Sequence, residues 1–307
     1  MTLRVTFLGT AGAVPTTERN PSGVHVNRDG DGLLFDVGEG TQRQMMRYGT
    51  GFDISNVFIT HFHGDHVFGL PGLLETWDFN GRESPITIHT PIHTRSDIAA
   101  LVTACDSDPT YPVHIREVAP GEIALEHEDY AVTAVRTNHR TRSVGYALVE
   151  TDRRGRFNRE KAEELGVPVG PKFSRLHEGH PIELEDGTVV DPEQVVGPPR
   201  PGRTMVYSGD TQPVDSIVEA AEGADLLIHD ATFGDEYEAR AAETGHSTAR
   251  QAGEIAARAG VSKLVLTHIS SRYAGDATPL AAQAREAFNG SVVIAHDGLE
   301  LDVPYRD

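Results

Sequence analysis

The stretch His61-Phe62-His63-Gly64-Asp65-His66 places four potential metal ligands within six residues, directly after the apolar run Val57-Phe58-Ile59-Thr60. This run predicts a short β-strand, so the ligand side chains are expected in a loop at the end of that strand. Imidazole and carboxylate groups suit zinc, and the single cysteine of the chain, Cys105, excludes a cage of thiolates. A metal site is favoured over a surface histidine cluster, because further candidate ligands follow other predicted strands.

Three polar residues follow later apolar runs in the same way. They are His139 after residues 130–137, Asp210 after residues 204–208 and His268 after residues 263–267. If these strands lie side by side, their ends meet at one rim with the histidine cluster. Ligand chemistry then predicts two metals: one is held by His61, His63 and His139, the other by Asp65, His66 and His268, and Asp210 bridges them.

Two metals roughly 3.5–4 Å apart suit phosphodiester hydrolysis, because they lower the pKa of a shared water and neutralise charge in the transition state. Asp65 can serve as a ligand and also accept the proton of that water. His246 precedes a predicted helix whose N-terminus favours phosphate, and it is a candidate proton donor to the leaving 3′ oxygen. His229 follows another predicted strand and is a second candidate; alternatively, it only orients a neighbouring group through a hydrogen bond.

The organisation of the chain predicts an α/β protein. Its 307 residues, 38% of them hydrophobic, fit one large domain with an insertion as well as two small domains. Residues 151–202 are rich in Pro, Gly and charge and indicate an arm inserted into that domain. Strands are predicted at residues 4–8, 32–37, 56–60, 86–89, 130–137, 144–150, 204–208, 225–229, 263–267 and 291–295, and helices at 40–48, 67–79, 214–221, 248–259 and 280–288.

The charge of the chain argues at first against a nucleic-acid substrate. The formal net charge is −19, and only three of the 27 basic residues are lysines, which is typical of a protein adapted to concentrated salt. Residues 140–175 nevertheless hold nine basic residues against five acidic ones, so positive charge gathers in the predicted arm. The alternative is a solvated charge run. One cysteine excludes a disulfide framework within the chain, and no signal peptide or membrane span is visible; a cytoplasmic location is therefore expected.

Several motifs together resemble the metallo-β-lactamase superfamily and, within it, the ribonuclease Z family. The resemblance covers nearly the whole chain. The motifs that carry it are Phe7-Leu8-Gly9-Thr10, Pro15-Thr16-Thr17-Glu18-Arg19-Asn20, Leu34 to Gln44, His61 to His66, Tyr207-Ser208-Gly209-Asp210-Thr211, Gly245-His246-Ser247-Thr248 and Leu266 to Tyr273.

This resemblance implies a four-layer αβ/βα sandwich with two zinc ions per subunit on one rim; manganese is an alternative metal. It implies a homodimer that cuts precursor tRNA on the 3′ side of the discriminator base, with no membrane attachment and no other protein partner. The arm would bind tRNA through Arg153, Arg154, Arg156, Arg159, Gly170, Pro171 and Lys172.

Two positions depart from the pattern of the family. Thr17 stands where a lysine is frequent, which leaves open how an end that already bears CCA is treated. Asp230 shortens a glutamate of the family by one methylene, in the run His229-Asp230-Ala231-Thr232.

The same residues allow other functions to be considered. A second hydrolase class on this scaffold comprises a glyoxalase II-type thioesterase, a β-lactamase, a small phosphodiesterase and an arylsulfatase. Neither the arm nor Gly245-His246-Ser247-Thr248 belongs to the thioesterase, and a zinc β-lactamase usually has a cysteine ligand, whereas Cys105 lies far from the candidate positions. A non-enzymatic RNA-binding or zinc-storage protein would have no use for Asp65 beside an open metal pair.

Overall fold

The computed structural model describes residues 2–104 and 109–306, so Cys105 lies outside the described residues. The chain forms two compact units, one of residues 1–149 and 203–305 and the other of residues 150–202 with the last two residues. No helix in the described part has both the length and the apolar character needed to cross a membrane.

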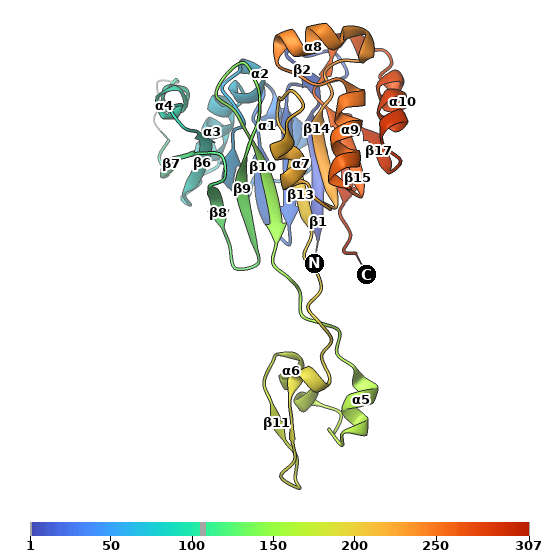
Figure 1. The fold of residues 1–307 in the computed structure, drawn as a ribbon. Coiled ribbons are helices and arrows are strands. Elements are labelled where there is room, and N and C mark those ends of the chain that lie inside the picture. The colour runs from blue at the N-terminus through green and yellow to red at the C-terminus, as the bar shows by residue number, and fades with distance from the viewer. Residues whose placement is uncertain (1, 105–108, 307) are drawn as a thin grey trace. The chain divides into compact units, whose positions relative to one another are not determined.

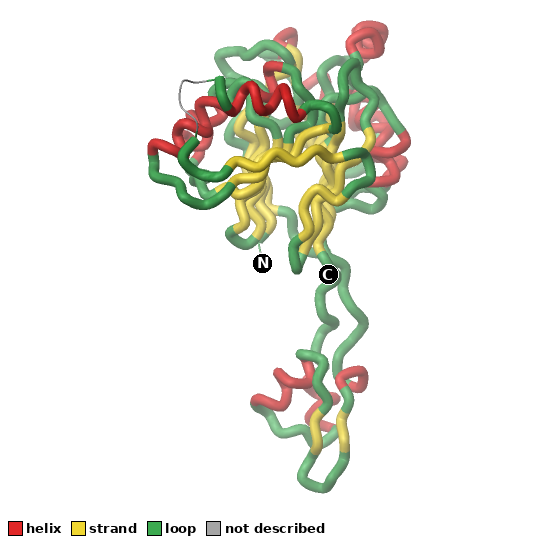
Figure 2. The backbone as a smooth tube through the Cα atoms, turned by 90° about the vertical axis from the view of Figure 1, so that its left-hand side faces the viewer, coloured by secondary structure: helices red, strands yellow, loops and turns green. Residues whose placement is uncertain are grey.

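The large unit is built on two seven-stranded sheets (Figures 1 and 2). The first sheet has the order β18 (Glu300–Asp302), β1 (Leu3–Gly9), β3 (Gly23–Arg28), β4 (Asp31–Phe35), β5 (Ile54–Phe58), β6 (Ile86–Pro91) and β7 (Val113–Val118). The second has the order β17 (Ser291–Ile294), β15 (Lys263–Thr267), β14 (Leu226–Asp230), β13 (Thr204–Tyr207), β10 (Val144–Glu150), β9 (Tyr130–Arg136) and β8 (Ile123–Glu126). The short strands β2 (Ala11–Gly12) and β16 (Ile269–Ser270) pair in parallel.

Helices cover the outer face of each sheet, as Figure 2 shows. Apolar side chains of α1 (Thr41–Tyr48), α3 (Leu70–Phe79) and α4 (Arg95–Val102) pack against the first sheet. Those of α7 (Asp215–Ala220), α9 (Ala249–Ala259) and α10 (Thr278–Ala287) pack against the second. The inner faces of the sheets share a third core that includes Phe7, Phe35, Phe58, Tyr146 and Tyr207. The predicted four-layer αβ/βα sandwich is therefore confirmed.

Parallel strands bring the candidate ligands together. In the first sheet β4, β5, β6 and β7 run parallel, and in the second β13, β14, β15 and β17 do so. Parallel strands in the middle of a sheet are buried on both faces, and β14 is buried along its whole length. Their carboxyl ends share one edge of each sheet, where the connecting loops can present polar side chains.

The predicted helix at 67–79 is divided in two. Residues Gly64–Val67 form the short helix α2, and α3 begins at Leu70. Gly69 stands between them because a Cβ atom at this position would lie 2.1 Å from the carbonyl oxygen of Gly38. Strands β3, β7, β8 and β18 and helices α4 and α8 (Glu238–Thr244) were not predicted from the sequence.

The small unit has a core of its own. It contains α5 (Arg159–Glu164), α6 (Pro171–His177), the hairpin of β11 (Ile182–Glu183) and β12 (Val189–Val190), and the 3₁₀ turn η1 (Pro192–Gln194). Its two connecting chains pair where the backbones of Arg153 and Arg200 exchange hydrogen bonds of 2.7 and 2.8 Å. The buried side chains that stabilise it are Ala162, Val167, Leu176, Ile182, Val190 and Val195.

Candidate metal centre

The histidine cluster occupies the turn between β5 and α3. Strand β5 ends at Phe58, and α2 then presents Asp65 and His66 from its first turn. His61 and His66 are fully buried, while His63 is exposed. The loops that follow β9, β13 and β15 bring His139, Asp210 and His268 to the same place, as predicted.

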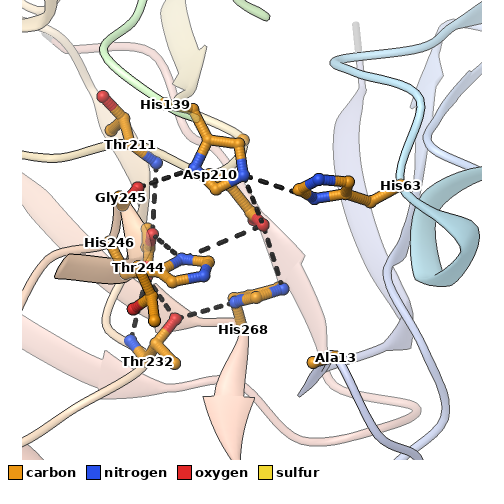
Figure 3. A network of polar contacts seen from close by, with 12 residues as sticks. Ala13, His63, His139, Asp210, Thr211, Thr232, Thr244, Gly245, His246 and His268 are labelled. Atoms are coloured by element: carbon orange, nitrogen blue, oxygen red, sulfur yellow. Dashed lines mark hydrogen bonds and ion pairs between the residues drawn. The ribbon is translucent and has the colours of Figure 1, made fainter. Parts of the chain in front are cut away.

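The first group of ligand atoms comes from His61, His63, His139 and Asp210, which offer atoms within 4.8 Å of one another. Nε2 of His61 lies 2.9 Å from Nδ1 of His63, and Nε2 of His139 lies 3.3 Å from the same atom (Figure 3). Oδ2 of Asp210 lies 3.6 Å from Nε2 of His61 and 4.0 Å from Nε2 of His139.

The second group comes from Asp65, His66 and His268, again with atoms within 4.8 Å. Oδ2 of Asp65 lies 3.3 Å from Nε2 of His268 and 3.6 Å from Nε2 of His66. Oδ2 of Asp210 lies 3.2 Å from Nε2 of His268 and 3.4 Å from Nε2 of His66. Asp210 therefore faces both groups, which is the position expected of a bridging carboxylate.

The donor atoms fit a pair of zinc ions. In a tetrahedral site with Zn–N bonds of about 2.0–2.1 Å, neighbouring donors lie about 3.3 Å apart, close to the spacings found here. Among the few buried polar side-chain atoms of the described residues that lack a hydrogen-bond partner are Nε2 of His66 and Oδ1 of Asp210. A buried polar atom without a partner is costly, and a metal ion would satisfy both of these.

Four of the candidate imidazole ligands are oriented by a hydrogen bond at Nδ1. His66 donates through Nδ1 to Oδ2 of Asp36 at 2.8 Å, and His139 lies with Nδ1 2.7 Å from the carbonyl oxygen of Gly245. His61 and His268 place Nδ1 at 3.0 and 2.7 Å from threonine hydroxyls. These contacts fix the tautomer that leaves Nε2 free for the metal.

The two threonine contacts are built alike. Thr60 donates its hydroxyl to Asp36 and accepts from His61, and Thr232 donates to Asp230 and accepts from His268. A buried carboxylate thus stands behind one histidine of each group. Such partners raise the basicity of an imidazole ligand and restrict the rotation of its ring.

The protonation states of the candidate ligands follow from burial and from neighbouring charges. Burial holds the pKa of His61 well below its usual range, so this imidazole is neutral. Burial alone would raise the pKa of Asp210, yet His268, His66 and His61 hold it well below its usual value. The pKa of His66 is raised although burial opposes this, because Asp210, Asp36 and Asp65 surround it. Metal binding would displace that proton.

A histidine–carboxylate pair lies beside the ligand groups. Nδ1 of His246 donates to Oδ2 of Asp230 at 2.8 Å and lies 3.9 Å from Oδ2 of Asp210 (Figure 3). Burial lowers the pKa of His246, but Asp230 and Asp210 raise it more, to about 9. His246 is therefore protonated at neutral pH. Sequence reasoning did not assign Asp230 to the site, although the run His229-Asp230-Ala231-Thr232 contained the signal.

His229 does not point into this site. It is fully buried, its Nδ1 donates to the carbonyl oxygen of Asp230 at 2.8 Å, and its Nε2 has no partner among the described residues. Successive side chains of a strand point to opposite faces, so the orientation of Asp230 toward His246 turns His229 away. The interpretation of His229 as a direct participant is corrected accordingly.

The predicted tRNA-binding residues all lie in the small unit. Some of their donors stabilise the unit itself: Arg154 reaches the carbonyl oxygen of His177 at 3.4 Å, Arg159 pairs with Glu163 at 2.7 Å, and Lys172 reaches the carbonyl oxygen of Glu183 at 2.9 Å. Gly170 has a φ of 147° and precedes Pro171 at the start of α6. Arg153 reaches the carbonyl oxygen of Pro201, and Arg156 lines a pocket of about 800 Å³ beside Phe157 and Val196.

Comparison with known proteins covers both units. A family model of the beta-lactamase superfamily domain matches residues 193–269, and a model of the anti-Pycsar protein Apyc1 matches residues 3–154. The ribonuclease Z of Halobacterium salinarum is 64% identical over 100% of this chain and 99% of that protein. The ribonuclease Z of Myxococcus xanthus is 50% identical and covers 99% of both chains. The crystal structure of human tRNase Z, short form, has a TM-score of 0.72 at 29% identity and covers 98% of this chain and 99% of that one.

Proposed function

Because this chain belongs to the ribonuclease Z family, we propose that it removes the 3′ trailer of precursor tRNA by one endonucleolytic cut that leaves a 3′-hydroxyl on the tRNA. The observation that carries the proposal is the rim on which Asp210 faces two groups of ligand atoms, with the protonated His246 beside it. This combination suits hydrolysis of a phosphodiester, because negative charge develops in the transition state both on the phosphate and on the leaving oxygen.

Two zinc ions would be held by His61, His63 and His139 and by Asp65, His66 and His268, with Asp210 between them. When bound, such a pair activates water near neutral pH and neutralises the charge on phosphate oxygens. Zinc is favoured over manganese because five of the seven ligands are imidazoles.

Asp65 orients the attacking water and takes its proton. His66 and His268 keep the pKa of this carboxyl low although burial opposes this, so Asp65 is ionised at neutral pH. The backbone N–H of Ala13 donates to its Oδ2 at 2.8 Å and fixes the rotamer. The carboxylate therefore needs little rearrangement when the water gives up its proton.

His246 donates a proton to the leaving 3′ oxygen of the tRNA. Asp230 holds the ring by Nδ1, which leaves Nε2 as the atom that meets the substrate. The cap residue Thr248 begins α9 two residues later, so the backbone N–H groups of this helix start beside the acid. A helix N-terminus stabilises phosphate, which favours this side for the scissile group.

The protein would act as a homodimer. The small unit of one copy would bind the body of the tRNA that is cleaved at the metal centre of the other copy. Basic residues concentrate around α5 and α6, whereas residues 176–202 carry six acidic side chains and one arginine. We assign tRNA contact to the α5–α6 side, where phosphates meet least repulsion. A cytoplasmic location is part of this proposal.

The test is cleavage of an end-labelled precursor tRNA in concentrated salt by the intact protein and by His63→Ala. We expect one cut on the 3′ side of the discriminator base, abolished in the variant together with one metal ion per chain. If the metal-loaded intact protein leaves the precursor uncut but hydrolyses a thioester or a small diester, the assignment to tRNA fails while the metal centre stands.

A further inference from the structure

An exposed arginine and an exposed tyrosine lie together next to the histidine–carboxylate pair. Arg272 belongs to the 3₁₀ turn η3 (Ser271–Tyr273), four residues after the ligand His268. Its Cζ atom lies 5.2 Å from the ring centroid of Tyr237 and 5.8 Å from that of Phe233. Tyr237 ends the turn η2 (Asp235–Tyr237), and 37% of its surface is exposed.

These side chains connect to the proton donor through one buried ring. The centroid of Phe233 lies 6.1 Å from that of Tyr237 and 6.2 Å from that of His246. Phe233 is only 5% exposed and pairs through its backbone with Thr248, the cap of α9. The aromatic row thus runs from the site of chemistry to the surface and ends under Arg272.

Arg272 has no carboxylate partner among the described residues, although the chain has far more acids than bases. The acids on either side of Tyr237 are engaged elsewhere: Asp235 pairs with Arg250 at 2.7 Å, Glu236 accepts from Tyr273 at 2.7 Å, and Glu238 accepts from Gln251 at 3.3 Å. Arg272 spends one guanidinium nitrogen on Ser270 Oγ at 3.3 Å. Its other donors and its planar face are available to a ligand.

The chemistry of this pair matches an unpaired nucleotide. A guanidinium over an aromatic ring offers a flat surface on which a base can stack and a charge that meets the adjacent phosphate. Stacking is the general way in which proteins bind the bases of single-stranded RNA. One ring, that of Phe233, separates the pair from the donor to the leaving oxygen, so the nucleotide within reach is one that flanks the scissile phosphate.

We propose that Tyr237 and Arg272 form a stacking platform that holds the base of the unpaired nucleotide next to the scissile phosphate. This inference rests on the proposed function and adds a positioning element to it. The platform acts by fixing that base, which in turn fixes the scissile bond against the metal centre and His246. Because stacking does not depend on counterion release, it persists in concentrated salt.

The test uses single-turnover cleavage of precursor tRNA by Tyr237→Ala, Tyr237→Phe, Arg272→Ala and Arg272→Lys. Loss of one stacking contact is expected to lower the cleavage rate at subsaturating enzyme by about 5- to 150-fold in Tyr237→Ala. Tyr237→Phe keeps the ring and should retain nearly full activity, whereas Arg272→Lys keeps the charge without the plane and should be impaired. Arg258→Ala on α9 removes an exposed arginine that pairs with Asp215, and it serves as the matched control.

A second arm of the experiment removes the base instead of the side chain. Precursors with an abasic discriminator nucleotide or an abasic first trailer nucleotide are given to the intact protein and to Tyr237→Ala. At the position that stacks, the abasic substrate should slow the intact protein and erase the difference between it and the variant.

A platform is refuted if Tyr237→Ala cleaves the normal precursor at the intact rate, or if its defect persists unchanged on both abasic substrates. Loss of bound metal in Tyr237→Ala would also refute it, because the defect would then arise in the metal centre. If the intact protein does not cut the normal precursor at all, the proposed function has failed, and the platform fails with it.

Discussion

Replacement of His246 by alanine separates proton donation from metal binding. Nδ1 of His246 lies 2.8 Å from Asp230, and the pKa of its ring is raised to about 9, so the ring carries the acidic proton at pH 7.5. A positioned general acid contributes roughly 10²- to 10⁴-fold to a rate, which corresponds to about 3 to 5 kcal/mol of activation free energy. His246→Ala should lose this whole factor on precursor tRNA.

The size of the loss should depend on the leaving group. The 3′ oxygen of a ribose is a poor leaving group and needs the proton, whereas p-nitrophenolate leaves without one. We therefore expect a loss of about 10²-fold or more in single-turnover cleavage of precursor tRNA, and a loss below about tenfold on bis(p-nitrophenyl) phosphate. Metal content per chain, measured by atomic emission, should stay at the value of the intact protein.

The control is His114→Ala, which removes an exposed histidine of β7. Equal losses on both substrates would refute the role of His246 as the acid. Loss of one metal ion in His246→Ala would identify His246 as a ligand instead, since its ring also belongs to a group with Asp210, Asp230 and His268.

Other predictions test the remaining parts of the site. Asp36→Asn removes the charged partner of His66 and Thr60 and should weaken metal binding by about 10- to 100-fold in a chelator competition. The control Asp53→Asn removes the charge of an exposed carboxylate and should leave metal binding unchanged. Because the acid His246 must be protonated, activity should fall as the pH rises through its pKa, which Asp230 raises. Asp230→Asn should therefore move the alkaline limb of the pH–rate profile to lower pH. If this limb does not move, it belongs to another group. Replacement of residues 154–199 by Gly-Gly retains the Arg153–Arg200 pairing. It should raise KM for precursor tRNA by at least about tenfold and leave hydrolysis of bis(p-nitrophenyl) phosphate unchanged. Equal losses on both substrates would show that the arm serves the fold of the large unit.

The sequence predicted that the candidate ligands lie together because most of them occupy regular positions. Asp210 and His268 follow the parallel strands β13 and β15, so the rule that parallel strands end at a common edge places them together. The rule does not cover His139, which follows β9, a strand that pairs antiparallel with β8, or the packing of the six-residue cluster of the first sheet against the second. The partners of these ligands were beyond such reasoning. Asp36 lies far from His66 in the chain, and their contact depends on the packing of the loop after β4 against α2, including a left-handed φ of 57° at Asp36.

The elements that were missed carry weak sequence signals. Strand β7 alternates between exposed and half-buried residues because it lies at the edge of its sheet, and β18 has only three residues. The sequence of the small unit has weak apolar periodicity. The reason is that its core is assembled from single apolar residues of short elements, such as Ala162, Leu176 and Val190. Short elements leave few periods to count, so hydrophobic periodicity fails there.

A net charge of −19 and a polyanionic substrate are compatible if binding depends on contact rather than on a field. At about 1 M salt the screening length is about 3 Å, so a general basic surface would contribute little to capture of RNA, while acidic residues still bind water and keep the protein soluble. The proposed contacts that would remain effective at this range are direct ones: metal ions and the cations around α5 and α6 against phosphate oxygens, the guanidinium of Arg272, and rings against bases. Arg272, which has no carboxylate partner among the described residues, fits this kind of direct contact.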